Sequence, residues 1–175
     1  MLLPVCGKGK PTGAMREAVN RVMRLRWVAG GGMLWGMSHT VVPRIPTLEE
    51  YRRLCRAVGW EDVMNFSAAE QALPRSLYAV VAEVNGVAVG MGQIVGDGAI
   101  FFYVQDVAVD PDHQGQGIGA AILSALVGWA RETAPDKAFL GVFAVKGTEP
   151  FYEREGFAAY AHDIGMFQVL LSAGG

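Results

Sequence analysis

The stretch VQDVAVDPDHQGQGIGAAIL, residues 104–123, decides how the rest of the sequence is interpreted. Strand-forming residues end in a proline-containing turn, and three closely spaced glycines then lead directly into an apolar segment. Apolar residues recur at helical spacing from Ile118 to Trp129, which predicts a helix that continues to about Thr133. The stretch therefore reads as a strand, a glycine-rich turn and the beginning of a helix.

A glycine-rich turn at the beginning of a helix presents backbone N–H groups that have no partner within the helix. Together with the positive end of the helix dipole, these groups form a site for a phosphate. Glycine is needed because a side chain would keep the phosphate from the backbone, and because glycine tolerates positive φ. A tight turn that binds no ligand is the alternative, and the glycines alone do not decide between the two.

Two known phosphate-binding patterns fit this turn poorly. The P-loop pattern G-x-x-x-x-G-K-[ST] fails because no Lys-Ser or Lys-Thr follows the glycines. A dinucleotide fingerprint can be formed from Gly115, Gly117 and Ala120, but the residues DPDH separate the strand from the first glycine. A nucleotide-binding regulator is therefore the weaker hypothesis.

A third pattern fits. The stretch closely resembles the acyl-CoA-binding motif of the GNAT superfamily of N-acetyltransferases, [Q/R]-x-x-G-x-[G/A], with Gln114, Gly117 and Gly119 in its defining positions. After one intervening strand, FYEREGF at residues 151–157 resembles the second family motif, Y-x-x-x-G-F. The order of predicted elements from about residue 39 to residue 171 also resembles that of the family.

The neighbouring sequence predicts a mixed α/β fold of the α+β type. Thr47 is expected to cap the first helix, Ser67 to open the second, and Asn85-Gly86 to join two strands as a hairpin. The predicted strands cover residues 38–45, 77–84, 87–95, 99–109, 137–145 and, as two closing strands, 157–170; the predicted helices cover residues 48–59, 67–76, 118–133 and 148–156. The resemblance implies a mixed, mostly antiparallel sheet of six to seven strands, flanked by about four helices and splayed at the acyl-CoA site.

The composition fits one globular domain. Of the 175 residues, 51% are hydrophobic and 18% are charged, which argues against disorder. Residues 1–36 carry six basic residues and one acidic residue, and we expect them to be a basic leader or extension outside the fold. Residues 37–175 are expected to form a single acetyltransferase domain.

The charge and the cysteines limit the partners. Residues 37–175 carry nine basic and sixteen acidic residues, so we expect no nucleic-acid partner, and a cationic substrate such as an amine would suit the surface. Cys6 and Cys55 lack the spacing of a disulfide framework or a zinc site, so we expect no metal and a reducing, cytoplasmic location. No apolar run is long enough to span a membrane, and a homodimer remains open.

The resemblance implies acetyl-CoA as the acyl-donor co-substrate. Its pantetheine arm would pair with a strand edge, and its pyrophosphate would bind the N–H groups of the glycine turn. The implied cofactor-binding residues are Val107, Ala108 and Val109 on the strand, and Gln114, Gly115, Gln116, Gly117, Ile118, Gly119 and Ala120 in the turn.

The resemblance also implies direct attack of an amine on the thioester, with Tyr152 as the general acid for the departing thiolate. A half-buried Tyr that only packs its helix is the alternative. The base is less clear, because the position where some relatives carry a catalytic Glu holds Tyr103, a poor base at neutral pH. Asp106, the only acid of its strand, is the candidate base, and a structural acceptor for nearby N–H groups is the competing interpretation.

Acceptor binding is expected near Trp60, Phe66 and Tyr103, which would suit the amine of a small molecule. The alternative for Trp60 and Phe66 is that they cap the core. Two other functions stay open: acetylation of a peptide or protein amine, and a non-catalytic acyl-CoA-binding sensor on the same fold.

Overall fold

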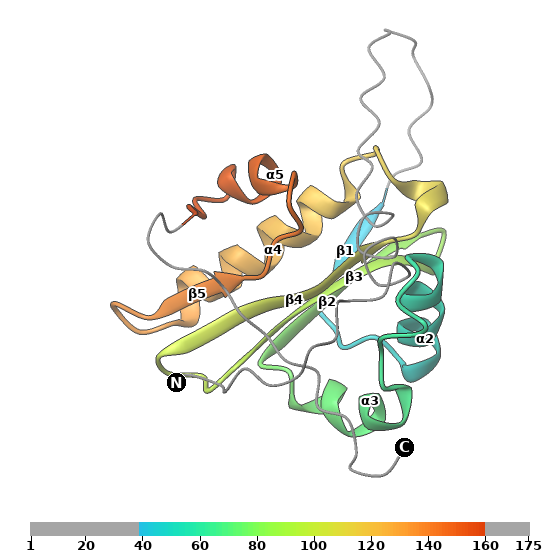
Figure 1. Cartoon of the computed structure of the whole chain (residues 1–175), viewed down its shortest axis with the longest axis horizontal. Coiled ribbons are helices and arrows are strands. Elements are labelled where there is room, and N and C mark those ends of the chain that lie inside the picture. The colour runs from blue at the N-terminus through green and yellow to red at the C-terminus, as the bar shows by residue number, and fades with distance from the viewer. Residues whose placement is uncertain (1–38, 160–175) are drawn as a thin grey trace, which may run out of the picture.

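The computed structural model describes residues 39–159 (Figure 1). The predicted basic leader and most of the two predicted closing strands lie outside the described residues. The part that is described contains the whole of the strand–turn–helix stretch and both motifs.

The centre of the fold is a five-stranded sheet with the strand order β1-β2-β3-β4-β5. Strands β1 to β4 pair with one another in antiparallel order, and β4 pairs with β5 in parallel. Their bounds are β1 Thr40–Val42, β2 Tyr78–Val84, β3 Val87–Gly96, β4 Phe101–Val109 and β5 Phe139–Val142. The prediction of a mixed, mostly antiparallel sheet is confirmed, with five strands in residues 39–159 instead of the six to seven predicted for the domain.

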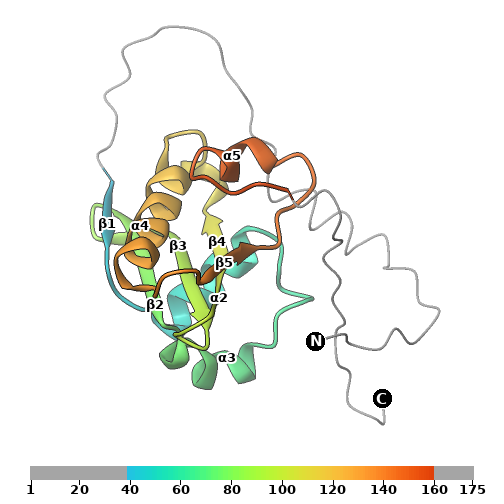
Figure 2. The ribbon, with the colours of Figure 1, turned by 90° about the vertical axis from the view of Figure 1, so that its left-hand side faces the viewer.

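Helices cover both faces of this sheet (Figures 1 and 2). The four α-helices are α2 Leu48–Ala57, α3 Phe66–Ala72, α4 Ile118–Thr133 and α5 Glu149–Glu153, and 3-10 turns occupy Leu73–Arg75 and Pro111–His113. One apolar cluster packs α2 and α3 against the sheet, and a second packs α4 and Tyr152 of α5 against it. The two faces are called here the α2 face and the α4 face.

Local sequence signals account for most element boundaries. Thr47 and Glu50 form a reciprocal capping box at the beginning of α2, and Gly59 has a φ of +81° just beyond its end. Asn85 and Gly86 both have positive φ, which is the conformation that a two-residue hairpin turn requires. Helix α4 has the predicted bounds.

Several predicted boundaries are wrong. Strand β1 ends at Val42 and not at residue 45, and α3 ends at Ala72, where a 3-10 turn replaces the rest of the helix predicted to residue 76. Asn65, and not Ser67, caps α3, because its side-chain oxygen accepts the N–H of Ala68 at 3.1 Å and also the hydroxyl of Ser67 at 2.6 Å. Both residue types are good caps, so sequence alone does not choose between them. Strand β5 is shorter than the predicted 137–145, because its pairing with β4 ends at Val142.

Side chains of α4 pack directly against the backbone of β3, because two strand residues there are glycines. A Cβ on Gly90 would lie 2.8 Å from Cδ1 of Ile122, and a Cβ on Gly92 would lie 2.7 Å from Cγ2 of the same side chain. A Cβ on Gly92 would also come within 2.9 Å of Leu126. Such distances are too short for real carbon contacts, so these glycines set how closely the helix packs against the sheet.

Strand β4 contains a β-bulge at Asp106. Met91 of β3 is opposite Ala108 and Gln93 is opposite Gln105, so two β4 residues face the single residue between Met91 and Gln93. Asp106 itself has a φ of +53°, which is uncommon for a residue other than glycine. The bulge redirects the strand just before residues 107–109.

Strands β4 and β5 pair only over part of their length. The register joins Phe101 with Phe139 and ends where Val104 meets Val142. Within residues 39–159, the last five residues of β4 have no partner on the β5 side. The edge where the resemblance places the pantetheine arm is therefore unpaired.

Candidate functional site

The glycine turn follows β4 and leads into α4. Gly115 and Gly117 have φ values of +77° and +81°, in the left-handed region that favours glycine. Among residues 39–159, a Cβ built on either glycine would meet nothing within 4 Å beyond its neighbours in the chain. The turn is therefore open on its outer side, where a ligand can approach the backbone.

The beginning of α4 offers donors to such a ligand. Gly117 caps the helix without a side-chain bond, and its carbonyl accepts the N–H of Ala121 at 3.0 Å. In the part of the chain that the structure describes, the N–H groups of residues 118–120 have no acceptor. Gln114 fixes the turn to the strand, because its side-chain amide donates to the carbonyl of Val109 at 2.9 Å. These residues fit the pyrophosphate of an acyl-CoA.

Asp106 is held on the α2 face by two donors. The hydroxyl of Tyr51 donates to Oδ2 of Asp106 at 2.9 Å, and the side-chain amide of Gln93 donates to the same oxygen at 2.6 Å. Ser76 in turn donates to the amide oxygen of Gln93. The other carboxylate oxygen, Oδ1, accepts no hydrogen bond from residues 39–159. The carboxylate is thus oriented through one oxygen only.

Burial sets the protonation of this cluster. It raises the pKa of Asp106, while the hydrogen bonds from Tyr51 and Gln93 lower it again in part. Burial and the charge of Asp106 raise the pKa of the Tyr51 hydroxyl well above its usual value, and they raise the pKa of the buried Cys55 thiol to about 12. Tyr51 is therefore a permanent donor, and Asp106 is the acid–base candidate of the cluster.

Tyr152 lies on the α4 face. Its side chain is only 5% exposed, and it packs edge-on against Phe151 and Phe157. Burial raises the pKa of its hydroxyl, which is therefore protonated at neutral pH. The ring of Phe151 comes within 3.7 Å of the position that a Cβ on Gly119 would take, so the second motif lies beside the glycine turn.

The two predicted catalytic residues therefore lie on opposite faces of the sheet. Tyr152 belongs to the apolar cluster of α4, whereas Asp106 bonds to Tyr51 of α2. Asp106 itself lies in the end of β4 that has no β5 partner among the described residues.

The predicted acceptor residues differ in their surroundings. Trp60 and Phe66 are partly buried against the cluster of α2 and α3, and the Phe66 ring meets Tyr51 edge-on at 6.4 Å between centroids. Tyr103 is 36% exposed and stacks on Phe143 at 6.3 Å. The structure brings Phe66 next to the Asp106 cluster, whereas Trp60 shows only packing contacts.

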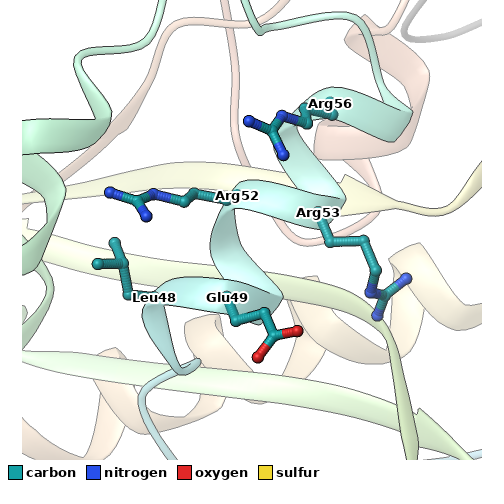
Figure 3. Close-up of a pocket in the computed structure, with 5 residues that line it drawn as sticks. All are labelled: Leu48, Glu49, Arg52, Arg53 and Arg56. Carbon is teal, nitrogen blue, oxygen red and sulfur yellow. The ribbon is translucent and has the colours of Figure 1, made fainter.

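Sequence reasoning missed the basic side of α2. A hollow of about 680 Å³ lies beside this helix (Figure 3) and is lined by Leu48, Glu49, Arg52, Arg53 and Arg56. The signal was present, since Leu48, Arg52 and Arg56 follow one another at four-residue spacing along one side of a helix.

Two absences hold for residues 39–159. No group of three or more His, Cys, Asp or Glu side chains in this range could hold a metal ion. None of the helices in the same range is long and apolar enough to cross a membrane.

Comparison with known proteins identifies the class that this fold and turn define. Residues 45–157, more than half of the chain, match the model of the acetyltransferase (GNAT) family. The chain belongs to the GNAT family of acetyltransferases.

Individual relatives agree with this assignment. A probable acetyltransferase of unknown function from meticillin-resistant Staphylococcus aureus is 27% identical with a TM-score of 0.70, over 77% of this chain and all of that one. A GNAT family acetyltransferase from Streptococcus pneumoniae is 29% identical with a TM-score of 0.65, over 76% of this chain and 98% of that one.

A curated relative is the chloroplastic GCN5-related N-acetyltransferase 2 of Arabidopsis thaliana. It is 36% identical over 80 residues, which make up 45% of this chain. The match spans only 30% of the length of the plant protein.

Proposed function

We propose that this acetyltransferase transfers the acetyl group of acetyl-CoA to a primary amine of a small molecule by direct attack in a ternary complex. The observation that carries the proposal is the open glycine turn at the beginning of α4, next to an unpaired strand edge. Left-handed glycines with free space outside them and helix N–H groups without acceptors are what a pyrophosphate requires.

The chain would bind the donor through its backbone. The N–H groups of the turn, residues 114–120, would hold the pyrophosphate. The edge of β4 at residues 107–109 would pair with the pantetheine arm like an added strand, because it has no β5 partner among the described residues.

Asp106 and Tyr152 would each carry out one of the proton transfers that the reaction needs. Oδ1 of Asp106 would take a proton from the ammonium, directly or through water, so that the nitrogen gains a free electron pair. The nitrogen then forms a bond to the thioester carbonyl carbon and loses its second proton to water, and the carbon–sulfur bond breaks to leave the amide. Tyr152 would give its proton to the departing sulfur, because burial raises the pKa of its hydroxyl and keeps it protonated at neutral pH.

A second candidate is an acyl-CoA-binding protein that catalyses no transfer. The deep burial of Tyr152 favours it, because a side chain that is 5% exposed and packed between two Phe rings also has a purely structural use. Both candidates share the same donor site, so only turnover separates them.

Thermal unfolding of the purified chain with acetyl-CoA, CoA, NAD or ATP tests the donor site. A ligand at a hundred times its dissociation constant is expected to stabilise the fold by about 2.7 kcal/mol. We expect a shift with acetyl-CoA and CoA alone, followed by thiol release when amines are added. Binding without thiol release from any amine would favour the second candidate, and a shift with NAD or ATP alone would contradict the proposal.

Replacing Tyr51 with Phe is expected to move the pH dependence of the reaction. The hydroxyl of Tyr51 lowers the pKa of Asp106, so its removal raises that pKa. A base works only when ionised, so the acid limb of the kcat/KM profile of Tyr51→Phe should shift to higher pH. An unchanged acid limb would exclude Asp106 as the base.

The matched control is Tyr78→Phe. Tyr78 is half-buried and stacks on Trp129 at 4.9 Å, so this substitution also removes one hydroxyl from a packed Tyr. Its pH profile should match that of the original protein.

A further inference from the structure

The outer side of α2 is basic although the chain as a whole carries a net charge of −2. Three arginines and one glutamate line the hollow beside this helix. Figure 3 shows Arg52 and Arg56 on the same side of the helix as Leu48, with Arg53 and Glu49 on the other side. Among the described residues that line the hollow, the side with two arginines and a leucine has no acidic one.

The three arginines differ in their partners. Arg53 lies 3.5 Å from a carboxylate oxygen of Asp110 and also donates to the carbonyl of Ala88. Arg56 bonds to Glu61 at 2.8 Å, but both side chains are more than half exposed, so the pair contributes little. Arg53 is thus committed to the fold, whereas Arg56 can exchange its partner at small cost.

Arg52 has an unmet donor. Its Nε is buried and has no hydrogen-bond partner among residues 39–159, and its Nη2 makes only a long contact of 3.4 Å with the carbonyl of Phe66. A buried donor without an acceptor is unfavourable. The Nε and Nη2 groups lie on one edge of the guanidinium, which is the arrangement that binds two oxygens of a carboxylate or phosphate. Because Nε is enclosed and Nη2 contacts the carbonyl of Phe66, the guanidinium must turn toward the hollow to present this edge to a ligand.

Direct contacts link this edge to the candidate base. Arg52 touches the carbonyl of Phe66, and the guanidinium of Arg56 lies 5.8 Å from the centre of the Phe66 ring. The same ring packs against Tyr51, whose hydroxyl bonds to Asp106. Contacts through Phe66 and Tyr51 thus connect the two arginines with the Asp106 carboxylate.

We infer that Arg52 and Arg56 bind an anionic group of the acceptor, so that the acceptor is a primary amine that also carries a carboxylate or a phosphate. The inference rests on the proposed function and makes it more specific. It also changes the expectation drawn from net charge, because the local charge beside α2 has the opposite sign to that of the chain as a whole.

Binding is measured first, without turnover. CoA is added at saturation to fill the glycine turn, and the thermal shift is recorded with β-alanine against β-alaninamide, and with O-phosphoethanolamine against ethanolamine. We expect stabilisation by at least one of the two amines that carry an anionic group, and none by its partner that lacks this group. The amine that gives the larger thermal shift identifies carboxylate or phosphate as the preferred group.

Turnover with acetyl-CoA is then compared between variants. In Arg52→Gln, the KM of the preferred anionic amine should rise about tenfold or more, with the KM of acetyl-CoA unchanged. Arg52→Lys keeps the charge but loses the paired donors, so its KM for this amine should lie between those of the original protein and Arg52→Gln. Arg75→Gln, which removes an exposed arginine from the turn after α3, is the control and should leave both constants unchanged.

The outcomes separate this inference from the proposed function. If amines without an anionic group bind and react as well as those with one, or if Arg52→Gln still prefers the amine with the anionic group, the anionic site is wrong and the acetyltransferase remains. If CoA does not bind, the proposed function is wrong, and the same amines tested without CoA still decide the anionic site. Absence of stabilisation by both anionic amines overturns the inference in either case.

Discussion

Gly117→Asp is expected to abolish acetyl-CoA binding, with a loss of affinity of about a hundredfold or more, because a fixed carboxylate would replace the pyrophosphate. Gly117 caps α4 with a φ of +81° and open space outside it. Asp tolerates this conformation better than most residues. Its carboxylate would also compete for the free N–H groups of the first helical turn, so the variant should fold.

Calorimetric titration with CoA measures the effect. Gly117→Asn is the matched control, because Asn has nearly the same size as Asp and tolerates positive φ, but it carries no charge. We expect the Asn variant to retain measurable binding, with the difference between the two variants due to charge. If the Asp variant binds CoA as tightly as the original protein, the turn is not the phosphate site.

Tyr152→Phe is expected to lower kcat about tenfold or more, because the departing thiolate loses its proton donor. The affinity for acetyl-CoA should stay within about twofold, since the substitution removes no backbone donor and no charge. Tyr152 packs between Phe151 and Phe157, and a Phe fits this environment. Single-turnover release of free thiol at saturating acetyl-CoA isolates the chemical step from binding.

Unchanged turnover in Tyr152→Phe would assign this side chain to packing alone. Tyr78→Phe controls for the loss of a hydroxyl from a packed ring elsewhere, since Tyr78 stacks on Trp129 on the α4 face. Its kcat should not change. The two variants therefore compare the same substitution, Tyr to Phe, at the proposed catalytic position and at a packed position away from it.

Features that depend on a few neighbouring residues could be predicted from the sequence. The capping of α2 by Thr47, the hairpin at Asn85-Gly86 and the extent of α4 each follow from residues within one or two turns of chain. The choice between Asn65 and Ser67 as the cap of α3 could not be made, because both residues fit the same rule and tertiary packing decides between them.

The candidate site was predictable in its backbone and less so in its side-chain partners. The glycine turn is contiguous in sequence, so it could be placed by pattern. The side chains that donate to Asp106 could not be predicted in this way, because Tyr51 precedes Asp106 by 55 residues and reaches it only when α2 packs on the sheet. The bulge at Asp106 was equally hidden, since no glycine marks its positive φ.

The close contact between α4 and β3 has a consequence for ligand recognition. Gly90 and Gly92 allow Ile122 to sit directly on the strand backbone, which holds the helix firmly against the sheet. The N–H groups at the beginning of α4 are therefore aligned before any ligand arrives. In such a preorganised site the entropy of ordering the loop is lost during folding and not during association, so affinity does not require a closing lid.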